Sequence, residues 1–190
     1  MACEGPAVRL RSLGIVLVLL PALLAGCGTQ QWKPFQSDAG HFSCLLPGPP
    51  QYKTSQALLP GTPFTLDHHN FTVKPRWSFG GPTYDVGYTD YTIPTKGVSV
   101  SFDTDKALDG FRDKILQTGR GKITLVAEKP MRIVEHSGRQ FEFDTPDGLL
   151  TTRVFFRKNR AYTLTVLHSK GRDYAREKER FFTSFQLVGG

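Results

Sequence analysis

Short stretches in which apolar and polar residues alternate recur along most of the chain, and this period of two predicts β-strands. In residues 41–46, Phe42, Cys44 and Leu46 share one face of such a strand. Residues 157–160 (RKNR) separate two later strands and predict a hairpin turn in which Asn159 takes the left-handed conformation. The other stretches with strand character are residues 52–59, 64–73, 84–91, 123–126, 131–134, 140–143, 149–156 and 161–168.

Two segments have helical spacing instead. Residues 103–119 repeat apolar side chains every three or four positions, with Asp103 or Thr104 placed to cap the start and Gly119 placed to end the helix. Residues 173–187 carry an aromatic stripe along one helical face. We therefore expect an α+β fold, an antiparallel β-sheet of about six to eight strands flanked by two helices.

The longest apolar run lies near the N-terminus, in residues 13–24. A helix that crosses a bilayer needs about 20 apolar residues. This run of 12 residues is too short to span comfortably. Because Arg9 and Arg11 precede it and small residues follow it, the segment has the arrangement of a signal peptide.

The segment ends in Leu24-Ala25-Gly26-Cys27, which resembles the lipobox of bacterial lipoproteins. The resemblance implies that a peptidase cuts before Cys27 and that its thiol carries a diacylglyceryl anchor with acyl chains of the palmitate type. The alternative is an ordinary secretory signal with an incidental cysteine. Gly28 stands where an Asp would favour retention in the inner membrane, so we expect the outer membrane or the outer surface of the cell envelope.

These features divide the chain into three predicted parts: a lipoprotein signal peptide (residues 1–26), a lipidated cysteine and tether (residues 27–40) and one α+β domain (residues 41–190). Trp32 and Phe35 in the tether either pack on the domain or enter the membrane interface.

Cysteine usage agrees with this division. Cys3 leaves with the signal peptide and Cys27 is acylated, so only Cys44 remains and no intramolecular disulfide is expected. Its place on the apolar face of a strand favours a buried, inert thiol over a reactive one.

The chain has a net charge of +7, and about +6 remains after removal of a signal peptide with two Arg and one Glu. This excess favours contact with polyanions such as phospholipid headgroups, lipopolysaccharide or wall polymers. Nucleic acid is not an expected partner outside the cytoplasm. Charges of both signs alternate in residues 172–180, which is typical of a solvated helix face.

The domain resembles uncharacterised bacterial secreted domains with a PsbP-like or Mog-like fold. The matching pieces are FSCLLPGPP (42–50), YDVGYTDYTIP (84–94), ALDGFRDKIL (107–116), SGRQFEF (137–143), RVFFRKNRAYTLTV (153–166) and FFTSFQL (181–187). The resemblance implies an antiparallel sheet flanked by helices and supplies no catalytic residues. Cys44 stands where this group usually has an aliphatic residue.

The sequence contains no catalytic motif. The motifs G-x-S-x-G and H-E-x-x-H are absent. The segment GRGKIT (119–124) is not a phosphate-binding loop, because Leu116 stands at the position of the first glycine and Ile123 at the position of the Ser or Thr. His68 and His69 are adjacent, so on a strand they point to opposite faces and do not chelate one ion together. Four acidic residues cluster early on the predicted helix 103–119: Asp103, Asp105, Asp109 and Asp113. This position favours capping and complementarity to the helix dipole over calcium binding, which would require a loop bent at a glycine. We expect no metal, no cofactor and no enzymatic activity.

Two arginines and three aromatic residues remain as candidates for a binding site. Arg139 and Arg160 match positions where the resembled group often has Arg; either they fork onto a carboxylate or carbonyl, or they contact an anion or a partner. Trp77, Tyr84 and Tyr88 either line a ligand groove or pack in the core.

These features favour a membrane-anchored envelope lipoprotein that acts as a non-enzymatic binding or assembly module. The anchor, the missing catalytic set and the resemblance to PsbP-like proteins support this interpretation. The alternative is a carrier or sensor of a lipid or other apolar ligand, which the many aromatic residues would suit.

Overall fold

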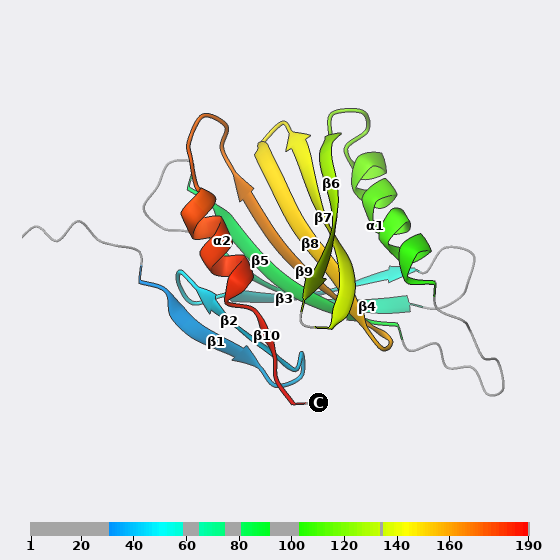
Figure 1. Cartoon of the computed structure of the whole chain (residues 1–190), viewed down its shortest axis with the longest axis vertical. Coiled ribbons are helices and arrows are strands. Elements are labelled where there is room, and N and C mark those ends of the chain that lie inside the picture. The colour runs from blue at the N-terminus through cyan, green and yellow to red at the C-terminus, as the bar shows by residue number, and fades with distance from the viewer. Residues whose placement is uncertain (1–30, 59–64, 75–80, 92–102, 134, 190) are drawn as a thin grey trace, which may run out of the picture.

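A computed structural model describes residues 31–58, 65–74, 81–91, 103–133 and 135–189 of the protein (Figure 1). Cys27 and Trp77 lie outside these ranges. Within them, no helix is long and apolar enough to cross a membrane. In chain order the elements are β1 (Lys33–Ser37), β2 (Phe42–Leu46), β3 (Gln51–Leu58), β4 (Thr65–Val73), β5 (Thr83–Asp90), α1 (Thr104–Thr118), β6 (Thr124–Ile133), β7 (His136–Thr145), β8 (Gly148–Arg157), β9 (Arg160–His168), α2 (Ala175–Thr183) and β10 (Gln186–Leu187).

The larger sheet has seven strands in the order β3-β4-β5-β9-β8-β7-β6, and all neighbours are antiparallel. The predicted antiparallel sheet flanked by two helices is thereby confirmed. Because β6 to β9 follow one another as hairpins, the β6–β7 and β8–β9 turns lie at one end of the sheet. The connection from α1 to β6 lies at the other end.

Each face of this sheet has its own apolar core. Alternation along β8 serves both cores, because Phe155 points to one face while Val154 and Phe156 point to the other. Helix α1 covers the second face through Leu108, which packs in a cluster with Phe141. The three-stranded sheet, in the order β1-β2-β10, and helix α2 cover the first face (Figure 1).

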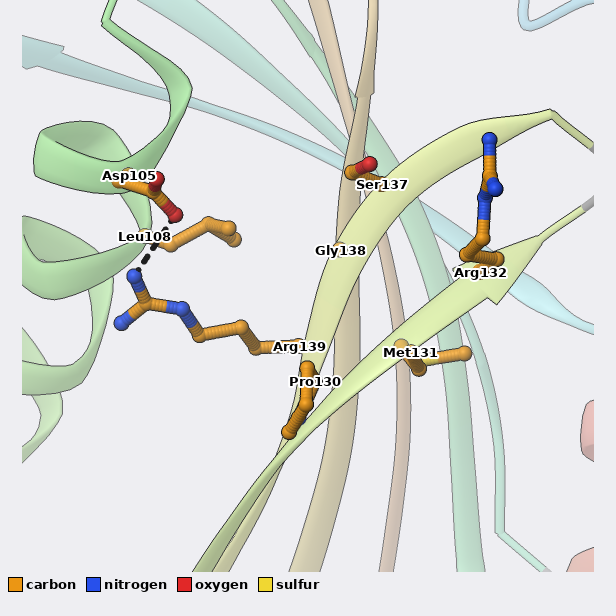
Figure 2. Close-up of a pocket in the computed structure, with 8 residues that line it drawn as sticks. All are labelled: Asp105, Leu108, Pro130, Met131, Arg132, Ser137, Gly138 and Arg139. Atoms are coloured by element: carbon orange, nitrogen blue, oxygen red, sulfur yellow. Dashed lines mark hydrogen bonds and ion pairs between the residues drawn. The ribbon is translucent and has the colours of Figure 1, made fainter.

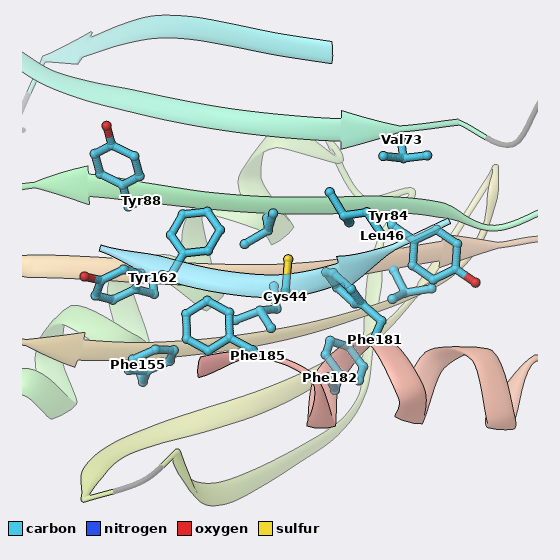
Figure 3. Packing of buried hydrophobic residues seen from close by; sticks show 14 residues of the cluster. Cys44, Leu46, Val73, Tyr84, Tyr88, Phe155, Tyr162, Phe181, Phe182 and Phe185 are labelled. Carbon is cyan, nitrogen blue, oxygen red and sulfur yellow. The ribbon is translucent and has the colours of Figure 1, made fainter. Parts of the chain in front are cut away.

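Aromatic rings fill most of the core beneath the smaller sheet. Phe42 of β2 is fully buried and its ring contacts those of Phe71, Tyr162 and Phe185. Cys44 lies in the same cluster (Figure 3), and burial raises the pKa of its thiol to about 12. At neutral pH such a thiol stays protonated, so the expectation of a buried, inert Cys44 is confirmed.

Helix α1 begins as its sequence predicts. The Asp103 carboxylate accepts hydrogen bonds from the backbone N–H groups of Asp105 and Lys106, both at 3.1 Å. Gly119 caps the other end of the helix. These contacts satisfy backbone groups that the helix itself leaves unpaired.

The predicted tether is wrong over residues 33–40, because the domain begins earlier than expected. Strand β1 pairs with β2, and the Trp32 ring packs edge-on against Tyr84 with a centroid distance of 5.2 Å. Phe35 packs on Phe71. The sequence did not predict this strand because Pro34 lacks a backbone N–H and disfavours a strand. β1 is an edge strand, where a missing N–H is tolerated. Trp32 and Phe35 therefore belong to the domain rather than to the membrane interface.

The terminal helix is also shorter than the predicted span of residues 173–187. It ends at Thr183, after which Gln186 and Leu187 pair with β2. The Ser184 hydroxyl accepts a hydrogen bond from the Leu45 N–H at 2.9 Å, which ties the end of the helix to the smaller sheet. The sequence predicted a longer helix because Phe185, which lies after the end of α2, also packs in the core and continues the helical spacing of Phe181 and Phe182.

Two further sequence expectations need correction. The predicted strands 123–126 and 131–134 form one strand, β6, which contains Pro130 and a register shift between Leu125 and Ala127. Both features are tolerated because β6 is an edge strand. In the β8–β9 turn, the left-handed residue is Lys158 with φ 53°, and not Asn159.

Tyr84 provides a test of this core. Its side chain is fully buried against Trp32 and Phe181, and its hydroxyl has no hydrogen-bond partner among the described residues. An unpaired buried hydroxyl costs about 1–3 kcal/mol. We therefore expect Tyr84→Phe to raise the free energy of unfolding by about 1 kcal/mol, measured by denaturant titration. A loss of stability would show that the hydroxyl has a partner.

Candidate functional site

Each of the two candidate arginines lies beside a pocket. A pocket of about 510 Å³ lies between the start of α1 and the β6–β7 hairpin (Figure 2), and its lining includes Asp105, Leu108, Met131, Arg132, Ser137 and Arg139. A second pocket of about 350 Å³ lies at the β8–β9 turn, and its lining includes His41, Asp90, Arg157, Lys158, Arg160 and Tyr162. We call this second site the Arg160 pocket.

Arg139 is held by three carboxylates. Its Nη1 donates to Asp109 at 2.6 Å and to Glu128 at 2.7 Å. Its Nη2 donates to Asp105 at 2.8 Å, as Figure 2 shows. Hydrogen bonds to Asp105 and Asp109 raise the pKa of Arg139. The side chain thus ties β7 to helix α1 and to the edge strand β6, which is the structural role that the sequence left open, and its charge is fully compensated.

Arg160 also forks onto a carboxylate. Its Nε and Nη2 donate to the two oxygens of Asp90 at 2.6 and 2.8 Å, and its Nη1 donates to the Ala39 carbonyl at 2.8 Å. The guanidinium carbon lies 4.5 Å from the centre of the Tyr88 ring. The hydrogen bond with Asp90 raises the pKa of Arg160. This arginine therefore joins β9, β5 and the β1–β2 turn into one rigid wall.

The cations next to Arg160 are not compensated in this way. Arg157 lies directly opposite Arg160 in the β8–β9 register, and Lys158 follows it in the turn. Among the described residues, neither side chain has a hydrogen-bond or ion-pair partner. Three cations therefore share one carboxylate, Asp90, and the pocket carries a formal charge of +2 with His41 neutral. Such a surface favours an anion.

The sequence interpretation missed this pocket. The sequence predicts Arg160 as a possible contact for an anion, but it assigns Arg157 and Lys158 only to a hairpin turn and gives His41 no role. The signal was three cations within four residues, but the sequence alone did not show which of them Asp90 compensates.

The candidate aromatic groove does not form from the residues described. Tyr84 is fully buried and Tyr88 is 5% exposed, and both belong to the core cluster of Figure 3. This is the packing alternative that the sequence left open. Trp77 lies outside the described residues.

Metal ligands are not assembled in the part of the chain that the structure describes. No group of three or more His, Cys, Asp or Glu side chains there could hold a metal ion. His68 contacts the Thr89 hydroxyl and His69 contacts the Tyr52 hydroxyl at 2.7 Å, each on its own side of β4. The two adjacent histidines therefore point to opposite faces, as predicted.

Asp85 is a carboxyl group with a raised pKa. Burial raises its pKa, and a hydrogen bond donated by the Thr72 hydroxyl partly opposes this effect. Because the folded protein holds the Asp85 proton more tightly than the unfolded chain, ionisation of this group at higher pH lowers the free energy of unfolding.

We therefore expect Asp85→Asn to be more stable than the parent protein at pH 7. The gain should shrink as the pH falls through the folded pKa and should vanish below the unfolded value of about 3.9. Denaturant unfolding of both proteins at pH 7 and near pH 3 measures this difference. A less stable Asn variant at pH 7 would mean that Asp85 is stabilised by its charge.

No protein-family model and no curated protein matches the sequence. Among solved structures, the chain is similar to cyanobacterial PsbP (CyanoP) from Synechocystis sp. PCC 6803. The two structures superpose with a TM-score of 0.56 at 10% sequence identity, over 86% of this chain and 96% of that chain. The domain has a PsbP-like fold. At this identity the similarity concerns the fold alone, so a role for the protein has to be argued from its own site.

Proposed function

We propose that this protein is a lipid-anchored, non-enzymatic binding module of the cell envelope, and that it recognises an anionic partner through the Arg160 pocket. The observation that carries the proposal is the pair of uncompensated cations, Arg157 and Lys158, beside the rigid Arg160–Asp90 fork. An open, preorganised pocket with excess positive charge suits recognition of an anion. The lipobox at Leu24-Ala25-Gly26-Cys27 supports attachment at the outer membrane or outer surface.

The structure gives less support to a carrier of an apolar ligand. The Arg160 pocket is lined mostly by charged and polar side chains, and charged or polar residues make up half of the lining of the pocket beside Arg139. The aromatic residues that would suit such a ligand, Tyr84 and Tyr88, are packed in the core. We therefore prefer the anion-binding module.

Photo-crosslinking in intact cells tests this proposal. Asn159 is exposed at the mouth of the pocket, and Gln117 is exposed on α1. A photoreactive residue at position 159 of the full, acylated chain should give a discrete adduct, and the same residue at position 117 should not.

A charge-matched pair of variants makes the test specific. Arg157→Gln/Lys158→Gln, the pocket variant, removes two cations from the pocket. Arg120→Gln/Lys122→Gln, the control variant, removes two exposed cations just before β6, at the opposite end of the sheet. The adduct from position 159 should disappear in the pocket variant and remain in the control variant. An adduct that persists in the pocket variant would contradict the proposal.

A further inference from the structure

The β8–β9 turn places three cations within four residues, Arg157, Lys158 and Arg160. Residues directly opposite each other in an antiparallel pair point to the same face, and like charges at such positions are destabilising. Arg157 and Arg160 are such a pair, and Lys158 lies between them in a left-handed conformation with φ 53°. A lysine in this conformation costs about 1–2 kcal/mol relative to glycine. A bound anion would offset the repulsion between the cations, although not the backbone strain at Lys158.

Among the described residues that line the pocket, Asp90 is the one carboxylate, and it compensates only one of these cations. Asp90 lies opposite Arg160 in the β5–β9 register, and both of its oxygens accept hydrogen bonds from Arg160. A guanidinium has five N–H donors. Three of those on Arg160 go to Asp90 and to the Ala39 carbonyl, and a fourth joins the guanidinium to the Tyr162 side chain. One N–H of Arg160 is therefore left for a ligand, and Arg157 and Lys158 supply the other donors of the pocket.

The walls of the pocket are fixed before any ligand arrives. The Tyr162 hydroxyl donates to the Gly40 carbonyl at 3.0 Å, and the Val188 N–H donates to the His41 carbonyl at 2.9 Å. With the Arg160 fork, these bonds hold the β1–β2 turn, β9 and the C-terminal strand together. A preorganised site of this kind loses little conformational entropy when it binds.

The pocket lies at the opposite end of β1 from the point where the described chain enters the domain. β1 begins at Lys33, next to Trp32, and the β1–β2 turn that follows it contributes His41 to the pocket. A strand of five residues spans about 15 Å. The pocket is therefore separated from Trp32 by about one strand length.

We infer that the Arg160 pocket binds a phosphate group, carried by a soluble phosphate ester or by a lipid headgroup. The formal charge of +2 matches a phosphate monoester, which carries about −1.5 to −2 at neutral pH, better than it matches a carboxylate. Guanidinium and ammonium donors together suit the several oxygens of phosphate. This inference rests on the proposed function, because it names the chemical group that the binding module recognises.

Nuclear magnetic resonance titration of the full, acylated chain in detergent tests the inference. The probes are inorganic phosphate, glycerol 3-phosphate and, as a carboxylate, acetate, all at constant ionic strength. Up to about 10 mM phosphate, the backbone amide signals of His41, Arg157, Lys158 and Gly189 should shift together. The pocket variant should bind phosphate at least about tenfold more weakly, because it lacks two charge-assisted donors, and the control variant should be unaffected.

Vesicles distinguish the two sources of phosphate. Because the acylated chain attaches to any vesicle through its anchor, the readout is the affinity for glycerol 3-phosphate in phosphatidylcholine vesicles with and without phosphatidic acid, whose headgroup is a phosphate monoester. Weaker binding of glycerol 3-phosphate in the presence of phosphatidic acid assigns the ligand to a headgroup; equal binding in the two kinds of vesicle assigns it to a soluble ester. Absent shifts with phosphate, equal shifts with acetate, or an equal loss in both double variants would each overturn the inference. If the crosslink from position 159 still depends on Arg157 and Lys158 in that case, the binding module stands and only its ligand is wrong.

Discussion

Replacing Cys27 with Ser is expected to abolish acylation of the protein completely. A thioether requires the cysteine sulfur, and the remaining cysteine of the domain, Cys44, is buried with a raised thiol pKa. Metabolic labelling with palmitate measures the effect, and mass spectrometry of the N-terminal peptide identifies the acylated atom. The mature parent protein should begin at Cys27 and carry the label, as the lipobox resemblance implies. The two acyl chains of a diacylglyceryl group would give stable membrane attachment where one chain does not.

Cys44→Ala is the matched control for this experiment, because it removes a cysteine that the account leaves unmodified. Its labelling should equal that of the parent protein. Two results would contradict a lipid anchor at Cys27. One is palmitate label retained by Cys27→Ser, and the other is a mature protein that is unacylated and diffuses freely. The Arg160 pocket would then have to act in solution.

The largest effect on stability is expected at Phe42. Its side chain is fully buried between the two sheets and contacts rings from β1, β4, β9 and the segment after α2. Truncation of a buried Phe to Ala removes this packing and leaves a cavity, at a cost of about 3–5 kcal/mol. Phe42→Ala should therefore lower the free energy of unfolding by this amount, measured by denaturant titration.

Tyr52→Ala is the control for Phe42→Ala, since it also removes an aromatic ring. Tyr52 lies on the edge strand β3 and is 54% exposed, so its loss should cost less than about 1 kcal/mol. Equal losses in the two variants would mean that the smaller sheet does not pack as described. The contacts that join β1 and β2 to the larger sheet would then need revision.

The alternation of apolar and polar residues predicted most of the larger sheet, because its central strands β5, β7, β8 and β9 have faces that must be buried. The Asp103 cap was predictable from the sequence because its hydrogen bonds reach only residues two and three positions further along the chain. The smaller sheet was not predictable in the same way. β10 has only two residues, and its partner Phe42 lies far away in the sequence, so no local pattern reports the pairing.

The binding pocket illustrates the same limit. Arg139 and Arg160 stood out in the sequence, but both turned out to be compensated by carboxylates from other elements. The uncompensated cations, Arg157 and Lys158, are identified only when the β5–β9 register places Asp90 opposite Arg160. Charge balance at a site assembled from distant segments depends on tertiary structure, and composition does not report it.

We propose that Arg157 and Lys158 serve to bind a ligand and do not stabilise the fold. The free energy of unfolding of the pocket variant tests this proposal. Removing two like charges that have no partner among the described residues should leave the free energy of unfolding within about 0.5 kcal/mol of the parent value, or raise it. Arg160→Gln, which breaks the fork onto Asp90, should lower it by about 1–3 kcal/mol. A loss of more than about 1 kcal/mol in the pocket variant would show that these cations hold the structure together, and it would contradict the account.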